Sequence, residues 1–165
     1  MAASSETPNR ASSRSAARLA AVQALYQMDM TGIDLTDVVA EFEAHRLGQE
    51  VEGDQYCAAE AKFFRDLTEG VVREQRQLDP MIDQQLAEGW RLNRVDSILR
   101  AVLRSGAFEL FMREDVPARV VITEYVDIAH AFFGEDEPKV VNGILDRLAR
   151  TARAGEFARS GAGNG

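Results

Sequence analysis

One stretch of the chain, residues 95–111, restricts the possible folds more than any other. Apolar side chains recur there at three- and four-residue steps, in the order Val95, Ile98, Leu99, Val102, Leu103, Ala107, Leu110 and Phe111. This spacing places the apolar groups on one face of an α-helix. A strand would need an alternation with a period of two, which the stretch lacks. We therefore predict a core helix, which the rest of the chain has to cover.

The same periodicity predicts further helices along most of the chain. Their approximate ranges are 14–30, 35–46, 55–75, 81–88, 117–133 and from 138 onward. Gly32 is expected to end the first helix, and Asp79-Pro80 to supply the cap and first position of the short helix at 81–88. The sixth helix should bury Val120 and Val121. Because alanine, arginine and glutamate, which favour helix, are the commonest residues of the chain, we predict an all-α fold of about seven helices.

The length of 165 residues suits one domain or two small helical halves that share a core. We predict a single helical domain over residues 14–153, with packed subdomains of about 14–89 and 90–153. Residues 1–13 and 154–165 are rich in small or polar side chains. Since such segments bury too little apolar area to offset their ordering entropy, we expect flexible tails.

The charge and the rarity of reactive side chains narrow the function. The net charge of −8 argues against indiscriminate binding to polyanions, so any nucleic-acid contact must be local. Cys57 is the single cysteine, and with His45 and His130 it forms no metal-ligand spacing. Neither a phosphate-binding glycine loop nor a nucleophile motif occurs. We expect no catalysis, no cofactor and no metal, and we interpret the acidic run from Glu41 to Glu60 as a solvated face.

The chain shows no sign of a membrane span or a secretory signal. No stretch approaches about 18 uninterrupted apolar residues, and residues 1–17 lack an apolar segment. We therefore expect a cytoplasmic protein. An organellar transit peptide would share the Arg- and Ser-rich composition of this end, but the segment before the first helix is short for one.

Positive charge is unevenly placed. Arg14 and Arg18 stand one turn apart on the first helix, and Arg100 and Arg104 repeat that spacing on the polar side of the fifth. Further cations lie at or near helix starts, at Arg91, Arg94, Arg119 and Lys139. Such residues can meet phosphates, helped by the helix dipole. Spacing alone, however, favours solvation or pairing with neighbouring acids.

Five segments resemble the NusB transcription antitermination family, in order over roughly residues 14–150. They are Ala-Val-Gln-Ala-Leu-Tyr at 21–26, Phe-Arg-Asp-Leu at 64–67, Ile-Leu-Arg-Ala-Val-Leu-Arg at 98–104, Phe-Glu-Leu at 108–110 and Lys-Val-Val-Asn-Gly-Ile-Leu-Asp at 139–146. The most specific part is Val-Asn-Gly-Ile-Leu-Asp after a Phe-Gly-Glu-Asp loop. Within it, Gly143 would let the seventh helix approach a neighbour closely, and Asn142 would bond backbone at a bend.

The resemblance implies a helical fold of two subdomains and a function without catalysis. Members of the family bind the boxA element of nascent RNA together with the ribosomal protein NusE. They act within the RNA polymerase antitermination complex, chiefly on ribosomal RNA operons. The resemblance therefore implies a boxA-type RNA and NusE as the partners of this chain.

The resemblance also implies which residues make these contacts. The positions that match RNA-facing groups are Arg14, Arg18, Arg100, Arg104, Arg119 and Lys139. The positions that match partner-facing groups are Tyr26, Phe132 and Asp136. Ser15 and Ala16 interrupt the basic run where relatives can carry continuous arginines, and Val140 replaces an aromatic residue of some relatives. Fewer phosphate contacts imply weaker binding to RNA alone, so affinity should depend on the protein partner.

Two other functions stay open. The first is the NusB-like RNA-binding domain that precedes a ribosomal RNA cytosine methyltransferase, although we expect no room for a cofactor-binding domain after the helices. The second is a protein-interaction module or homodimer without RNA binding, favoured by the net charge and the thin arginine cluster. Replacing Arg14 and Arg18 by alanine separates these ideas, because unchanged RNA affinity would support the interaction module.

Overall fold

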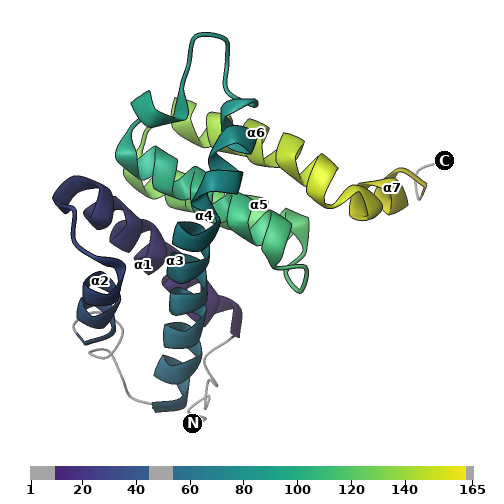
Figure 1. Cartoon of the computed structure of the whole chain (residues 1–165). Coiled ribbons are helices and arrows are strands. Elements are labelled where there is room, and N and C mark those ends of the chain that lie inside the picture. Colours follow the sequence, from purple (N-terminus) through teal and green to yellow (C-terminus); the bar gives the residue numbers. More distant parts are fainter. Residues whose placement is uncertain (1–9, 45–53, 163–165) are drawn as a thin grey trace. The chain divides into compact units, whose positions relative to one another are not determined.

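The computed structural model describes residues 10–44 and 54–162, and these residues form helices joined by turns (Figure 1). The helices are α1 (Arg10–Thr31), α2 (Leu35–Phe42), α3 (Asp54–Asp83), the 3-10 helix η2 (Leu92–Arg94), α4 (Ser97–Met112), α5 (Ala118–Phe132), α6 (Asp136–Ala152) and α7 (Ala154–Ala162). No strand occurs among the described residues, so the all-α prediction is confirmed. Within these ranges, none of the helices combines the length and apolar character that a membrane span requires.

The contacts of the chain group into two units, Met1–Glu69 and Gly70–Gly165. The change from one unit to the next falls inside α3, whereas the subdomain boundary is predicted from the sequence near Gly89 and Trp90. Helix α3 is continuous at this point because no proline or capping side chain interrupts it there.

In the first unit, α1 packs against α2. Helix α1 ends as predicted at Gly32, which takes a φ of 73° and donates its amide to the Met28 carbonyl at 2.9 Å. The rings of Phe42 and Phe64 stack with their centroids 5.6 Å apart. The buried apolar side chains of this unit include Ala17, Ala21, Val22, Ala24, Val38, Phe42, Phe64 and Leu67.

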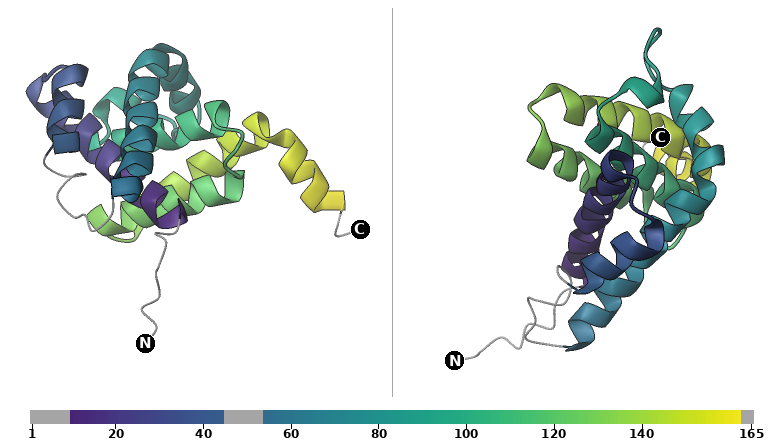
Figure 2. Two further views of the ribbon diagram at one scale, coloured as in Figure 1. Left: turned by 90° about the horizontal axis from the view of Figure 1, so that it is seen from below. Right: turned by 60° about the vertical axis from the view of Figure 1, so that its left-hand side comes forward.

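In the second unit, α4, α5 and α6 pack on one another (Figure 2). Helix α4 is the predicted core helix, and all of its residues from Ala101 to Leu110 are buried except Arg104. Asp96 caps its start, since the carboxylate accepts the Ile98 amide at 2.8 Å. The prediction that Val120 is a core residue is wrong, because this side chain is 42% exposed on the outer side of α5.

Helices α4 and α6 approach each other closely at Gly106. The prediction that Gly143 permits the close approach is wrong. A Cβ on Gly106 would lie 2.8 Å from Leu145 Cδ1, so a larger residue has no room. At Gly143 the nearest atom to such a Cβ is Arg147 Nη1 at 3.4 Å, at the far end of a flexible side chain. The small residue that this contact requires is therefore on α4.

The predicted short helix at 81–88 is wrong. Helix α3 runs on to Asp83 with Pro80 in its last turns, and turns follow. Asp79 does not act as a cap, because its carboxylate accepts two hydrogen bonds from Arg104, both at 2.8 Å. Since Pro80 has no amide hydrogen to donate, α3 forms one helical hydrogen bond fewer in its last turns.

The predicted tail at 154–165 is also wrong in part, since residues 154–162 form α7, which turns off the end of α6 (Figure 2). Glu156 anchors it: one carboxylate oxygen accepts the Ala118 amide at 2.9 Å and the other accepts Arg153 Nη1 at 2.8 Å. Arg153 is 6% exposed and also donates to the carbonyls of Leu110 and Val116. These tertiary contacts order a segment whose composition is poor in apolar side chains.

Candidate nucleic-acid interface

Helices α5 and α6 carry two adjoining hollows on their outer side. One has a volume of about 430 Å³ and is lined in part by Arg119, Asn142 and Arg150. The other has a volume of about 550 Å³ and is lined in part by His130, Lys139 and Asn142. Asn142, which had been predicted to bond backbone, is exposed and lines both hollows. This face therefore presents hydrogen-bond donors that suit phosphate oxygens, next to the carboxylates of Glu135, Asp146 and Glu156, which also line the hollows.

Arg119 and Lys139 are the predicted RNA-facing residues on this face. Both side chains are exposed, and neither forms a hydrogen bond or ion pair with another described residue. Arg150 differs, because its Nε pairs with Asp146 at 3.0 Å and its guanidinium lies 4.9 Å from the centre of the Phe157 ring. The two exposed cations can turn toward a polyanion without breaking a contact of the described chain.

The predicted RNA-facing residues of α4 are engaged inside their own unit. The side chain of Arg104 is 12% exposed and forms a bidentate ion pair with Asp79. Its Nε and Nη2 atoms each donate to one carboxylate oxygen at 2.8 Å. Arg100 Nη1 donates to the Leu92 carbonyl at 3.1 Å, and its Nη2 donates to Ser97 Oγ at 3.2 Å. These contacts tie α4 to α3 and to the turn before it.

The predicted cations of the first unit lie against an aromatic ring. The guanidinium carbons of Arg14 and Arg18 are 4.7 Å and 5.1 Å from the centre of the Phe63 ring. Arg14 is half-buried, whereas Arg18 is only 2% exposed. Spacing predicted that they share a helix face, and the structure brings both to Phe63.

The predicted partner-facing residues fall in both units. Tyr26 is half-buried on α1. Phe132 is the last residue of α5 and is half-buried, and Asp136 is the first residue of α6 and is exposed. Phe132 and Asp136 therefore flank one turn. A carboxylate in the first turn of a helix is stabilised by the helix dipole.

The buried polar groups of the second unit were missed by sequence reasoning. Tyr125 donates its hydroxyl to Glu109 at 2.5 Å, and neither residue is exposed. The signal was a carboxylate within the most apolar stretch of the chain, Ala107 to Leu110. Arg153 had no such signal, because it lies at the edge of a segment that was interpreted as a tail.

Some predictions concern residues that the structure does not describe. His45, Glu50 and Glu52 lie outside the described residues, as do residues 1–9 and the side chain of Cys57. His130 is exposed. Within the described part of the chain, no three histidine, cysteine or acidic side chains gather in a way that could hold a metal ion.

Comparisons with known proteins place this helical architecture among the antitermination proteins. The model of the NusB family matches residues 15–150. The transcription antitermination protein NusB of Nitrobacter hamburgensis is 63% identical over 150 residues, which cover 91% of this chain and 94% of that protein. The structure of T. maritima NusB matches with a TM-score of 0.70 and 33% identity, over 83% of this chain and 90% of that one.

A further solved structure shows the same fold in a complex. It contains the antitermination factors NusB and NusE together with double-stranded RNA, and it matches with a TM-score of 0.70 over 84% of this chain and 97% of that one. At 24% identity, this likeness shows the fold alone.

Proposed function

Because the chain belongs to the NusB family, we propose that it is a transcription antitermination factor that binds boxA RNA of nascent ribosomal transcripts together with NusE. The observation that carries the proposal is the match to antitermination proteins along nearly the whole chain. The protein acts by binding and not by catalysis, as part of the RNA polymerase antitermination complex in the bacterial cytoplasm.

On the RNA side, Arg119 and Lys139 contact phosphates of the bound strand, and Arg14 adds a contact from α1. The exposure of the first two and the hollows that they line support this assignment. For Arg18, Arg100 and Arg104, contact with RNA stays a prediction. The burial of Arg18 and the internal contacts of all three residues support a structural role inside their own units.

On the protein side, Phe132 and Asp136 offer NusE an aromatic ring and a carboxylate on the two sides of one turn, and Tyr26 offers a second ring on α1. The exposure of Asp136 supports a contact with a cationic group of the partner. Replacing Asp136 with asparagine should weaken the binding of NusE and leave the helical content unchanged. Calorimetric titration with NusE and far-ultraviolet circular dichroism measure the two effects, and unchanged NusE affinity would remove Asp136 from the interface.

The RNA contacts are tested by the anisotropy of labelled boxA RNA at two salt concentrations, with and without NusE. Arg119→Ala and Lys139→Ala should each weaken binding and lower the slope of log K against log salt by about 1, because each removes one phosphate contact. Arg76→Ala is the matched control, an exposed arginine on α3 that should change neither quantity.

Two outcomes would contradict the proposal. If boxA RNA bound no better than a scrambled RNA in the presence of NusE, boxA recognition would be wrong. If the slope of log K against log salt and the RNA affinity were both unchanged in Arg119→Ala and Lys139→Ala, the α5–α6 face would not contact the RNA. An interaction module without RNA contact at this face would then be the better interpretation.

A further inference from the structure

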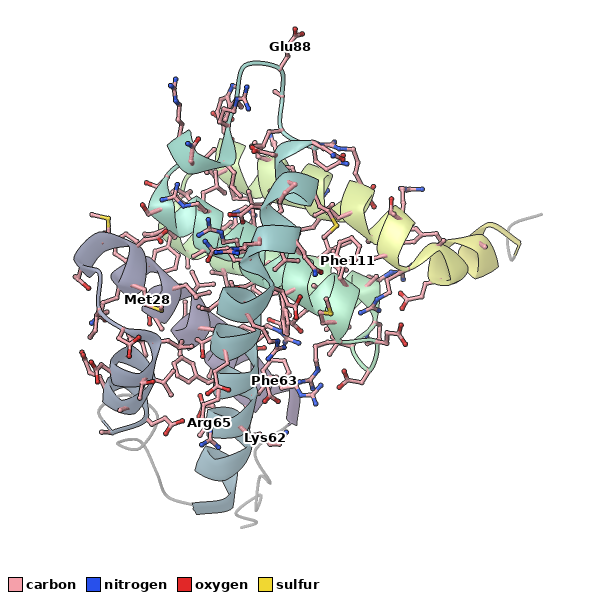
Figure 3. The ribbon with its side chains drawn as sticks, in the orientation of Figure 1. Met28, Lys62, Phe63, Arg65, Glu88 and Phe111 are labelled. Carbon is pink, nitrogen blue, oxygen red and sulfur yellow. The ribbon has the colours of Figure 1, made fainter. Side chains whose placement is uncertain are left out.

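The turn between α3 and η2 exposes a large aromatic side chain. Trp90 is 56% exposed, although an indole ring usually gains more from burial than any other side chain. Glu88 lies at the outer end of this turn, beyond the helices of the second unit (Figure 3). Gly89 has a φ of 89°, a conformation that favours glycine, and directs the chain back toward the unit.

The turn that carries Trp90 is fixed on both sides. Before it, Arg147 of α6 donates to the carbonyl and the side-chain oxygen of Gln85, at 2.8 Å and 3.0 Å. After it, the Leu92 amide donates to Asp83 Oδ1 at 2.7 Å, and the Leu92 carbonyl accepts Arg100 Nη1 at 3.1 Å. The Leu92 side chain is buried. These contacts fix the backbone on both sides of Trp90 and so keep its indole ring exposed to solvent.

Two cations flank the exposed ring. Arg91 and Arg94 line a hollow of about 250 Å³ together with Gly89, Trp90 and Val95. Both arginine side chains are exposed, and neither pairs with another described residue. The hollow is smaller than the pockets of about 300–1,000 Å³ that enclose whole small molecules. A hollow of this size, lined by an aromatic ring and two cations, fits one planar group that is attached to an anionic chain.

We propose that Trp90 stacks on an unpaired base of the bound RNA while Arg91 and Arg94 hold the phosphates beside that base. Single-stranded RNA is recognised through aromatic stacking combined with arginine contacts to the backbone. A protein surface would also cover an indole, but two exposed arginines beside the ring favour a polyanion in a chain whose net charge is −8. This inference rests on the proposed RNA-binding function and adds a base contact to it.

The chain provides its own optical probe, because Trp90 is its only tryptophan. Unlabelled full-length protein is titrated with boxA RNA while the indole emission is recorded, and a parallel titration follows the anisotropy of labelled RNA. We expect the emission to be quenched with the same midpoint as the anisotropy change. Trp90→Ala should weaken RNA binding by about 5- to 100-fold, and Trp90→Phe should retain most of the affinity.

Val72→Ala is the matched control, since Val72 is an exposed apolar residue of α3 and its loss should leave RNA affinity unchanged. Normal RNA binding by anisotropy, with constant indole emission and less than a twofold change in Trp90→Ala, would overturn the inference and leave the proposed function intact. An absence of RNA binding by anisotropy would overturn both. If Trp90→Ala lowered the affinity for NusE and not for RNA, the ring would belong to a protein interface, which also overturns the inference.

Discussion

At the scale of single residues, the second unit depends on polar groups that are buried with partners. Arg153 illustrates this, because its guanidinium donates to the carbonyls of Glu109, Leu110, Arg113 and Val116 at the end of α4 and just beyond it. A cation at the C-terminus of a helix is favoured by the helix dipole. Two of these carbonyls accept a backbone amide as well, Glu109 from Arg113 at 3.0 Å and Arg113 from Val116 at 3.1 Å. The same guanidinium reaches Glu156 and so connects α4 with the start of α7.

Removal of two buried hydroxyl groups in this core should change the free energy of unfolding by different amounts. Tyr125 donates to Glu109, so Tyr125→Phe leaves a buried carboxylate short of one donor and should lower the free energy of unfolding by about 1.5–3 kcal/mol. Ser105 Oγ is buried and has no hydrogen-bond partner among the described residues. Ser105→Ala should leave this free energy unchanged or raise it by up to about 1 kcal/mol.

Urea unfolding of the two variants measures both effects, and each serves as the control for the other. Equal losses of stability would contradict the assignment, because they would mean that both hydroxyls act only through packing.

The sequence shows where the cations and acids stand along the chain, but it does not show which of them pair in the fold. The partner of Arg104 is Asp79, on another helix, so no i±4 rule could find it. Arg119 and Lys139, which stand near helix starts, could be singled out from sequence, and they are exposed in the structure. Their contact with RNA stays a prediction.

At the scale of the helices, local capping signals were predictable and tertiary anchoring was not. Gly32 ends α1, as its sequence context predicts, because the signal is contained in neighbouring residues. Pro80 suggested a new helix start, but Asp79 is committed to Arg104 and cannot cap. Helix α7 depends on Glu156 reaching Ala118 and Arg153, and the first of these contacts spans a long sequence separation.

The close contact of α4 with α6 makes a prediction about two glycines. Gly106→Ala places a methyl group 2.8 Å from Leu145 Cδ1, so it should destabilise the protein by about 1–3 kcal/mol despite the better helix propensity of alanine. Gly143→Ala meets only the end of Arg147 and should stabilise α6 by up to about 1 kcal/mol.

Thermal unfolding followed by circular dichroism compares the two variants directly. A loss of stability in Gly143→Ala together with no loss in Gly106→Ala would show that the close approach had been assigned to the wrong helix.

At the scale of the whole molecule, the fold class followed from apolar periodicity, and the family followed from ordered motifs in the helices. Both are confirmed, because these features are encoded locally and repeat along the chain. The candidate site was less predictable, since exposure depends on how helices pack. Arg18 and Arg119 are the same residue type on amphipathic helices, yet only Arg119 is exposed.

The central claim, that this protein suppresses termination through boxA, is tested most directly by transcription readthrough. RNA polymerase transcribes a template with boxA upstream of a terminator, in the presence of NusE and the other antitermination factors, with or without this protein. We predict that adding the protein raises the fraction of full-length transcript, and that mutating boxA removes the increase. Equal readthrough with and without the protein would contradict the claim.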